Sequence, residues 1–169
     1  MSNADSSFNQ DNYKLENIFR SKFLFDSVHE VMENMAGLSV RETKIQGFNE
    51  MSFDNPSVSG VYFMKGPKDA VLILSIPTGA AFTMVSFMSS IPAQELDRDS
   101  ICDAINELTN MIAGKLKAQL SQKGYKYTSL QSFTIYGQNY SILHKNKLES
   151  ITKKYETDDM ELVLRILFI

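Results

Sequence analysis

The chain has 169 residues, a formal net charge of -3 and a hydrophobic fraction of 43%, values typical of one globular domain with its own core. The net negative charge gives no basic surface for a nucleic acid, and no apolar run reaches the roughly twenty residues of a membrane helix. A single cysteine excludes an internal disulfide, and no secretory leader is recognisable. We therefore expect a cytoplasmic protein that binds neither nucleic acid nor membrane.

The N-terminal part of the chain predicts a polar tail and one amphipathic helix. Residues 1–14 are rich in Ser, Asn and Asp without an apolar period, so we expect a disordered tail, in part a vector remnant, before a single domain over residues 15–169. Apolar residues recur at helical spacing over residues 21–36. Gly37 follows, where the missing Cβ allows the left-handed turn that ends a helix.

Three extended segments and a shorter helix are predicted next. Apolar and β-branched residues alternate or cluster in three segments, at residues 38–47, 57–64 and 70–76. The Gly66-Pro67 step is typical of a hairpin loop between the last two. Residues 78–90 lack the β-branched run of their neighbours, so we expect a helix there with Thr78 as its cap.

The second half predicts the longest helix and three more strands. The helix is expected over residues 99–122, opened by Asp99 with Asp97 nearby and closed by Gly124. Strands are predicted at residues 125–137, 148–156 and 160–169, with a turn at Asp158-Asp159 between the last two. Hairpin-length connections favour antiparallel pairing, so we expect an α+β fold with one antiparallel sheet packed against helices.

The two halves share a spaced polar pattern. It is found at Asp26, Glu30, Glu33 and Gly37 and, 77 residues later, at Asp103, Glu107, Asn110 and Gly114. On a helix each set forms one stripe opposite an apolar face. Gly60 and Gly137 keep the same separation in the strands. The chain is therefore interpreted as a tandem duplication of an α-β-β-β unit, with pseudo-repeats at about residues 21–90 and 99–169.

The second stripe can be read as plain surface or as a docking face. A Glu and an Asn on an exposed helix face are usually only solvated. However, Asn is a poor helix residue, and a mid-helix glycine costs about 1 kcal/mol relative to alanine, so Asn110 and Gly114 are costly choices for plain surface. A glycine also lets another backbone approach closely. The substitution of Asn110 for the Glu33 of the first copy is therefore where we look for function.

The segment at residues 103–120 resembles the signature helix of the CheC/CheX/FliY-type chemotaxis phosphatase family. In that helix an acid, three residues, Glu, two residues and Asn precede Met-Ile-Ala-Gly, as they do here. The similarity extends from about Phe23 to Ile169 and includes the Ser59-Gly60 strand. Because only one helix carries the Glu-x2-Asn pair, the chain resembles CheX more than two-site CheC proteins. The resemblance implies the family's duplicated α-β-β-β fold.

The resemblance also implies a reaction and a partner. Family members hydrolyse the aspartyl phosphate of a CheY-type response regulator, which itself holds Mg²⁺, so no cofactor is expected in this chain. By resemblance, Asn110 aligns the attacking water and Glu107 binds the regulator's conserved lysine. Asp103, Met111 and Gly114 are expected to contact the partner, with a solvated first-turn acid as the alternative for Asp103. A non-catalytic docking module that binds a response regulator or another signalling protein is the alternative function.

The remaining sequence features concern assembly and other chemistry. The chain has Leu130 to Phe133 where the family usually has a proline. The closing strand is apolar on both faces and is expected to be covered on both sides; because CheX-like proteins pair through sheet edges, a homodimer is expected. His29 and His144 give no metal-ligand spacing, and Cys102 is expected to be a buried, inert thiol.

Overall fold

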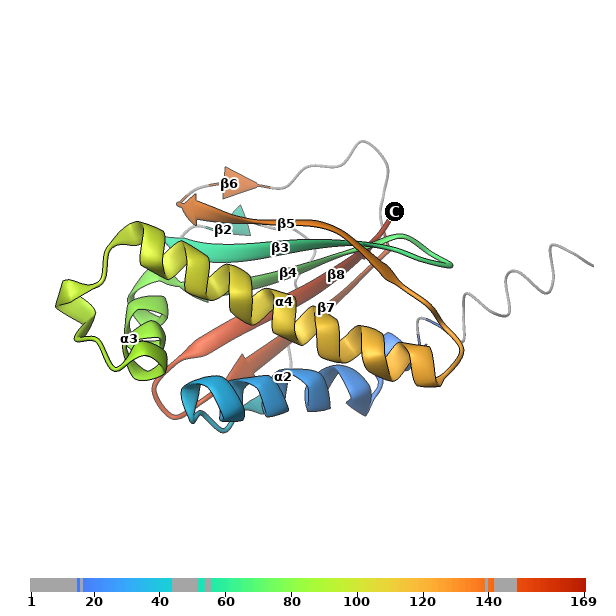
Figure 1. Cartoon of the computed structure of the whole chain (residues 1–169), viewed down its shortest axis with the longest axis horizontal. Coiled ribbons are helices and arrows are strands. Elements are labelled where there is room, and N and C mark those ends of the chain that lie inside the picture. Colours follow the sequence, from blue (N-terminus) through green and yellow to red (C-terminus); the bar gives the residue numbers. More distant parts are fainter. Residues whose placement is uncertain (1–14, 16, 44–51, 54–55, 139, 142–148) are drawn as a thin grey trace, which may run out of the picture.

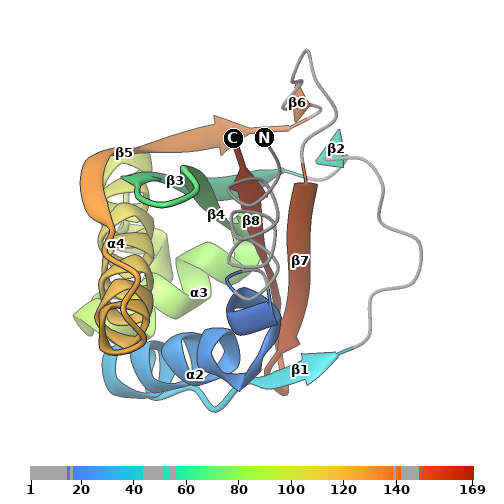
Figure 2. The same ribbon diagram turned by 90° about the vertical axis from the view of Figure 1, so that its right-hand side faces the viewer.

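The structure, a computed structural model, places three long helices on one face of an antiparallel sheet. It describes residues 15, 17–43, 52–53, 56–138, 140–141 and 149–169. The helices are α2 (Lys22–Ala36), α3 (Thr78–Ser89) and α4 (Arg98–Gln122). Figure 1 shows α4 and α2 side by side, and Figure 2 shows the sheet curving around the helices. No helix in the described part of the chain is long and apolar enough to cross a membrane.

Six strands form the main sheet, in the order β1-β7-β8-β4-β3-β5, and every neighbouring pair is antiparallel. Their bounds are β1 (Arg41–Thr43), β3 (Ser57–Lys65), β4 (Ala70–Pro77), β5 (Thr128–Gly137), β7 (Glu149–Glu156) and β8 (Glu161–Phe168). The single antiparallel sheet with helices confirms the predicted fold class. The sequence did not predict the pairing of β2 (Ser52–Phe53) with β6 (Tyr140–Ser141), or the short 3-10 helix Ala93–Glu95.

The strand order has the symmetry expected of a duplication. The first half supplies β1, β3 and β4, and the second half supplies β5, β7 and β8, each set after one long helix. Exchanging the two sets, strand for strand, reproduces the same sheet order read backwards. The halves join at three pairs: β1 with β7, β8 with β4, and β3 with β5. A common origin of the halves stays a prediction, and the predicted tail at residues 1–14 lies outside the described residues.

The ends of α2 follow the sequence prediction. Ser21 has an extended backbone and accepts a hydrogen bond from the Phe23 N–H at 3.4 Å, as an N-cap serine does. At the other end Gly37 has a φ of 65°, in the left-handed region, and its N–H donates to the Glu33 carbonyl at 3.0 Å. These two caps fix the length of the helix that carries the first stripe.

Two predicted N-cap residues are wrong, by one and by two positions. Pro77, not Thr78, lies at the N-cap of α3, so Thr78 is already within the first turn, and its Oγ1 is buried with no partner in the described part of the chain. Asp97, not Asp99, caps α4, because its carboxylate accepts from the Ser100 N–H at 2.7 Å. This hydrogen bond holds the pKa of the Asp97 carboxyl below its usual value.

The first strand is shorter than predicted. β1 covers Arg41–Thr43 within the predicted range of residues 38–47. Leu38 is still engaged in closing α2, because its N–H donates to the Met32 carbonyl at 3.2 Å. The end of the predicted strand, residues 44–47, lies outside the described residues.

The core fills the space between the helices and one face of the sheet. Alternate residues of β8 point into it and are at most 3% exposed: Leu162, Leu164, Ile166 and Phe168. The opposite face carries a smaller cluster formed by Val61, Val71 and Ile73, with Leu167 packed against it. β8 is an internal strand, so both of its edges are paired within the chain, whereas Val163 and Leu167 on the face away from the helices are only half-buried.

Candidate functional site

Helix α4, which carries the second stripe, packs against β3 at a glycine. A Cβ on Gly60 would lie 2.0 Å from Thr109 Oγ1, too close for any real contact, and 3.1 Å from the Ile105 carbonyl oxygen, which is a tight contact. Thr109 is fully buried and its hydroxyl donates to the Ile105 carbonyl at 2.7 Å. The glycine at this strand position therefore lets the helix backbone approach the sheet. This approach also sets how far Asn110, which follows Thr109 in α4, lies from the sheet.

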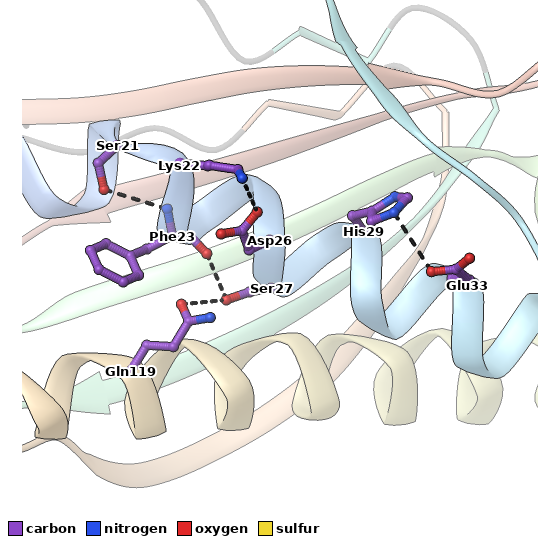
Figure 3. Close-up of polar contacts among 8 residues, drawn as sticks. All are labelled: Ser21, Lys22, Phe23, Asp26, Ser27, His29, Glu33 and Gln119. Carbon is purple, nitrogen blue, oxygen red and sulfur yellow. Dashed lines mark hydrogen bonds and ion pairs between the residues drawn. The ribbon is translucent and has the colours of Figure 1, made fainter.

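Two polar contacts tie α4 to α2. Ser27 is buried, and its hydroxyl donates to Gln119 Oε1 at 3.1 Å, as Figure 3 shows. Lys115 forms an ion pair with Glu30 at the surface of the two helices. The two polar stripes therefore belong to neighbouring helices, and one lysine of the second helix is neutralised by an acid of the first.

The acids of the first stripe all have basic partners. Asp26 lies 3.8 Å from Lys22, Glu33 lies 3.6 Å from His29, and Glu30 pairs with Lys115 (Figure 3 shows the first two pairs). Such exposed pairs contribute little to stability, about 0–1 kcal/mol each. Their consequence is chemical, because Asp26 and Glu30 each lie beside a lysine, and Glu33 lies beside a histidine that is charged only when protonated.

The second stripe is unpaired. Asp103 and Glu107 are exposed, and neither carboxylate has a basic partner within the described residues. The sequence suggested that Asn110 is exposed, but the residue is half-buried. Its Oδ1 is shielded from solvent and has no hydrogen-bond partner among the described residues. A Cβ on Gly114 would meet nothing within 4 Å, so the surface over this glycine is open.

The other predicted site residues are less available. Met111 is half-buried and packs against the core, so only part of its side chain can reach a partner. Cys102 is half-buried rather than buried, and burial, together with Asp99 and Asp103, raises the pKa of its thiol, which makes the thiolate scarcer. His29 stacks on the Phe25 ring with a centroid distance of 5.4 Å.

One residue of the site was missed by the sequence reading. Asn106 lies on α4 between the stripe and β5, and its Oδ1 is also buried without a partner among the described residues. The signal was available, because Asn106 stands one helical turn before Asn110, and residues four apart share a face.

The arrangement can bind and orient but carries no activated nucleophile of its own. Glu107 offers a free carboxylate to a cation, and Asn110 offers both an acceptor and donors without charge. No cluster of three or more His, Cys, Asp or Glu side chains suited to a metal ion occurs within the described residues. The chemistry that these groups suit best is therefore the alignment of groups held by another molecule.

The fold is that of the CheC-like superfamily. A CheC-like protein from Shewanella sp. PV-4 superposes with a TM-score of 0.75 at 24% identity, covering 88% of this chain and 96% of that one. The chemotaxis protein CheX of Desulfovibrio desulfuricans gives a TM-score of 0.76 at 23% identity, with 90% and 99% covered. CheX in a CheX-CheY-BeF3-Mg²⁺ complex from Borrelia burgdorferi gives 0.71 at 17%, with 87% and 96% covered.

The chain belongs to the CheX family. The family model described as chemotaxis phosphatase CheX matches residues 58–156, more than half of the chain, and this match includes the whole of α4. No curated protein sequence matches the chain. The predicted family is thereby confirmed, whereas the roles of individual residues rest on the geometry above.

Proposed function

We propose that the chain is a CheX-like phosphatase that hydrolyses the aspartyl phosphate of a CheY-type response regulator. The observation that carries the proposal is the contrast between the stripes: the acids of the first are paired within the chain, whereas Glu107 is free one turn before the unpartnered Asn110. Membership of the CheX family and the complex of a Borrelia CheX with CheY support the choice of partner.

In this proposal Asn110 orients the attacking water. The water oxygen forms a bond to phosphorus while the bond from phosphorus to the aspartate oxygen breaks. The aspartate leaves as a carboxylate without needing a proton, and both protons of the water remain with the phosphate product. The Asn110 side chain turns its oxygen out of the shielded position that it has in the free chain, accepts a hydrogen bond from the water and so directs the lone pair of the water at phosphorus. Since phosphoryl transfer depends chiefly on positioning and on charge already in place, one oriented water accounts for a large acceleration. A carboxylate at this position would be repelled by the phosphoryl oxygens.

Glu107 is proposed to bind a lysine of the regulator, and Asp103 and Gly114 to border the contact. The carboxylate of Glu107 gains a charge-assisted hydrogen bond only in the complex, because it has no basic partner among the described residues. The regulator is proposed to hold Mg²⁺, in line with the Borrelia complex, in which BeF3 stands in for the phosphoryl group. A role with a response regulator also implies that the protein acts in the cytoplasm.

The proposed pair is tested by comparing equivalent substitutions in the two helices. Glu107→Gln is expected to weaken both binding to a phosphorylated CheY-type regulator and its dephosphorylation, because the carboxylate of the ion pair is lost. Glu30→Gln at the matching position of α2 is the control and is expected to change neither. Equal effects of the two substitutions, or no effect of either, would remove Glu107 from the mechanism.

We also propose that the protein is a homodimer formed through a sheet edge. β5 is the longer of the two edge strands; it pairs with β3 on one side and with no described strand of the main sheet on the other. Leu130 and Phe133 of this strand are 59% and 42% exposed. An uncovered edge of this length favours pairing with a second strand. Light scattering at micromolar concentration tests the proposal, and a 19.1 kDa particle would exclude the dimer.

A further inference from the structure

The seam between α4 and β5 contains a polar side chain that the proposed mechanism does not use. Asn106 is half-buried on α4, and its Oδ1 is shielded from solvent with no partner in the described part of the chain. A buried carbonyl oxygen without a hydrogen bond costs stability, and Asn is a poor helix residue. The fold alone gives no reason for an asparagine at this position.

The position of Asn106 follows from the regular contacts along the seam. Arg98 lies over the Tyr136 ring at 4.7 Å, and the Cys102 carbonyl accepts from Thr134 Oγ1 at 3.0 Å. From the first contact to the second, the helix advances four residues and the strand two, and both distances are about 6 Å. The next step places Asn106 opposite Ser132, at the surface between the helix and the edge of the sheet.

Several other polar groups along this seam have partners within the chain. The Thr134 hydroxyl bonds the Cys102 carbonyl, and Lys117 donates to the Tyr62 hydroxyl at 2.7 Å and to Ser129. Within the described residues, the buried side-chain oxygens of α4 that lack partners are those of Asn106 and Asn110. The two unpartnered amides are four residues apart on one side of the helix, so a molecule that covers one also reaches the other.

We propose that Asn106 is a second partner-contacting residue, whose side chain turns outward from its shielded position so that its carboxamide hydrogen-bonds main-chain groups of the response regulator at the rim of its active site. The proposal rests on the function proposed above. A carboxamide has the same donor and acceptor groups as a peptide unit. Four residues of helix place Asn106 about 6 Å from Asn110, so Asn106 lies beside the position proposed for the reacting phosphoryl group and not at it. Asn106 is thus a positioning residue, which sets affinity and the alignment of Asn110.

The test is Asn106→Ala, measured for stability and for binding. The probe is a CheY-type receiver domain loaded with beryllofluoride and Mg²⁺, titrated calorimetrically. The substitution removes an unpaired buried oxygen and introduces a better helix former, so the melting temperature is expected to rise. Affinity for the loaded receiver is expected to fall about fivefold to tenfold, the loss of one or two hydrogen bonds. Asn34→Ala, in the exposed surface of α2, is the matched control and is expected to leave affinity unchanged.

The outcomes separate this inference from the proposed function. Unchanged affinity of Asn106→Ala, with the unaltered chain binding the loaded receiver, overturns the inference alone. A fall in melting temperature with unchanged affinity assigns Asn106 a purely structural role and also overturns it. Binding weakened by Asn106→Ala in a chain that does not hydrolyse the phosphorylated receiver supports the inference and contradicts the phosphatase. If the unaltered chain binds no loaded receiver, both proposals fail.

Discussion

Replacing Gly60 with alanine tests how α4 is held against the sheet. The new methyl group would lie 2.0 Å from Thr109 Oγ1, 2.8 Å from Thr109 Cβ and 3.1 Å from the Ile105 carbonyl oxygen. Rotation of the threonine side chain can relieve the first contact but not the contact with its Cβ or with the helix backbone. The helix must therefore move away from β3, and with it Glu107 and Asn110.

The size of the effect follows from two opposing terms. Overpacking a well-packed interior costs about 1–3 kcal/mol, and three contacts that include backbone place this site near the upper end. Alanine in place of a strand glycine returns about 0.5–1 kcal/mol through the lower entropy of the unfolded chain. The net loss is about 2 kcal/mol. For a chain of this size, this corresponds to a fall in melting temperature of about 4–8 °C.

Thermal unfolding of the unaltered chain and four variants decides the matter. Gly79→Ala is the matched control, because a Cβ there meets nothing within 4 Å, and it is expected to be neutral or stabilising. Thr109→Ala removes the closest atom, so adding it to Gly60→Ala is expected to cost less than the sum of the two single changes. Strict additivity, or an unchanged melting temperature for Gly60→Ala, would show that the helix does not rest on Gly60.

Three further substitutions differ in their expected effect on stability. Gly114→Ala is expected to raise stability by about 1 kcal/mol, because its methyl group meets open space, and to weaken the action on a phosphorylated regulator; unimpaired action would remove Gly114 from the contact surface. Asp97→Ala is expected to lower the melting temperature at pH 7. Because folding lowers the pKa of this carboxyl, the stabilisation exists above the unfolded value of about 3.9 and is lost as the pH falls through the folded value; a difference that persists at pH 2 would contradict this. Tyr155→Phe removes a buried hydroxyl that has no partner within the described residues, so unfolding in denaturant should show a change of no more than about 1 kcal/mol; a larger loss would reveal a hidden hydrogen bond.

Much of the fold could be predicted because its determinants are local. The apolar period of the two long helices, the αL glycine at residue 37 and the Gly66-Pro67 loop all lie where the sequence indicated. The N-cap residue of α3 was missed because Thr78 and the preceding Pro77 are both compatible with a helix start. Only the backbone dihedrals show that Pro77 is the N-cap. The β2-β6 pair joins two-residue segments far apart in the chain, and periodicity cannot reveal it.

The candidate site was predictable in part. Its residues follow from a spaced pattern on one helix, which sequence comparison within the chain can detect. The asymmetry of charge could not be predicted, since it depends on Lys115 of α4 reaching Glu30 of α2 across the helix pair. The shielding of the Asn106 and Asn110 oxygens likewise depends on how closely α4 approaches the sheet, and the contact of Gly60 with Thr109 sets that approach.

The central claim is that Asn110 enables this chain to hydrolyse an aspartyl phosphate held by another protein. The most direct measurement is the lifetime of a phosphorylated CheY-type regulator from the same cell, with the unaltered chain or with Asn110→Ala added in catalytic amounts. The account predicts that the unaltered chain shortens the lifetime and that the substitution reduces the acceleration about a hundredfold, while the melting temperature is maintained or raised. An unaltered chain that binds the regulator without shortening its lifetime would instead identify a docking module. A folded Asn110→Ala protein with full activity would contradict the assignment of the catalytic residue.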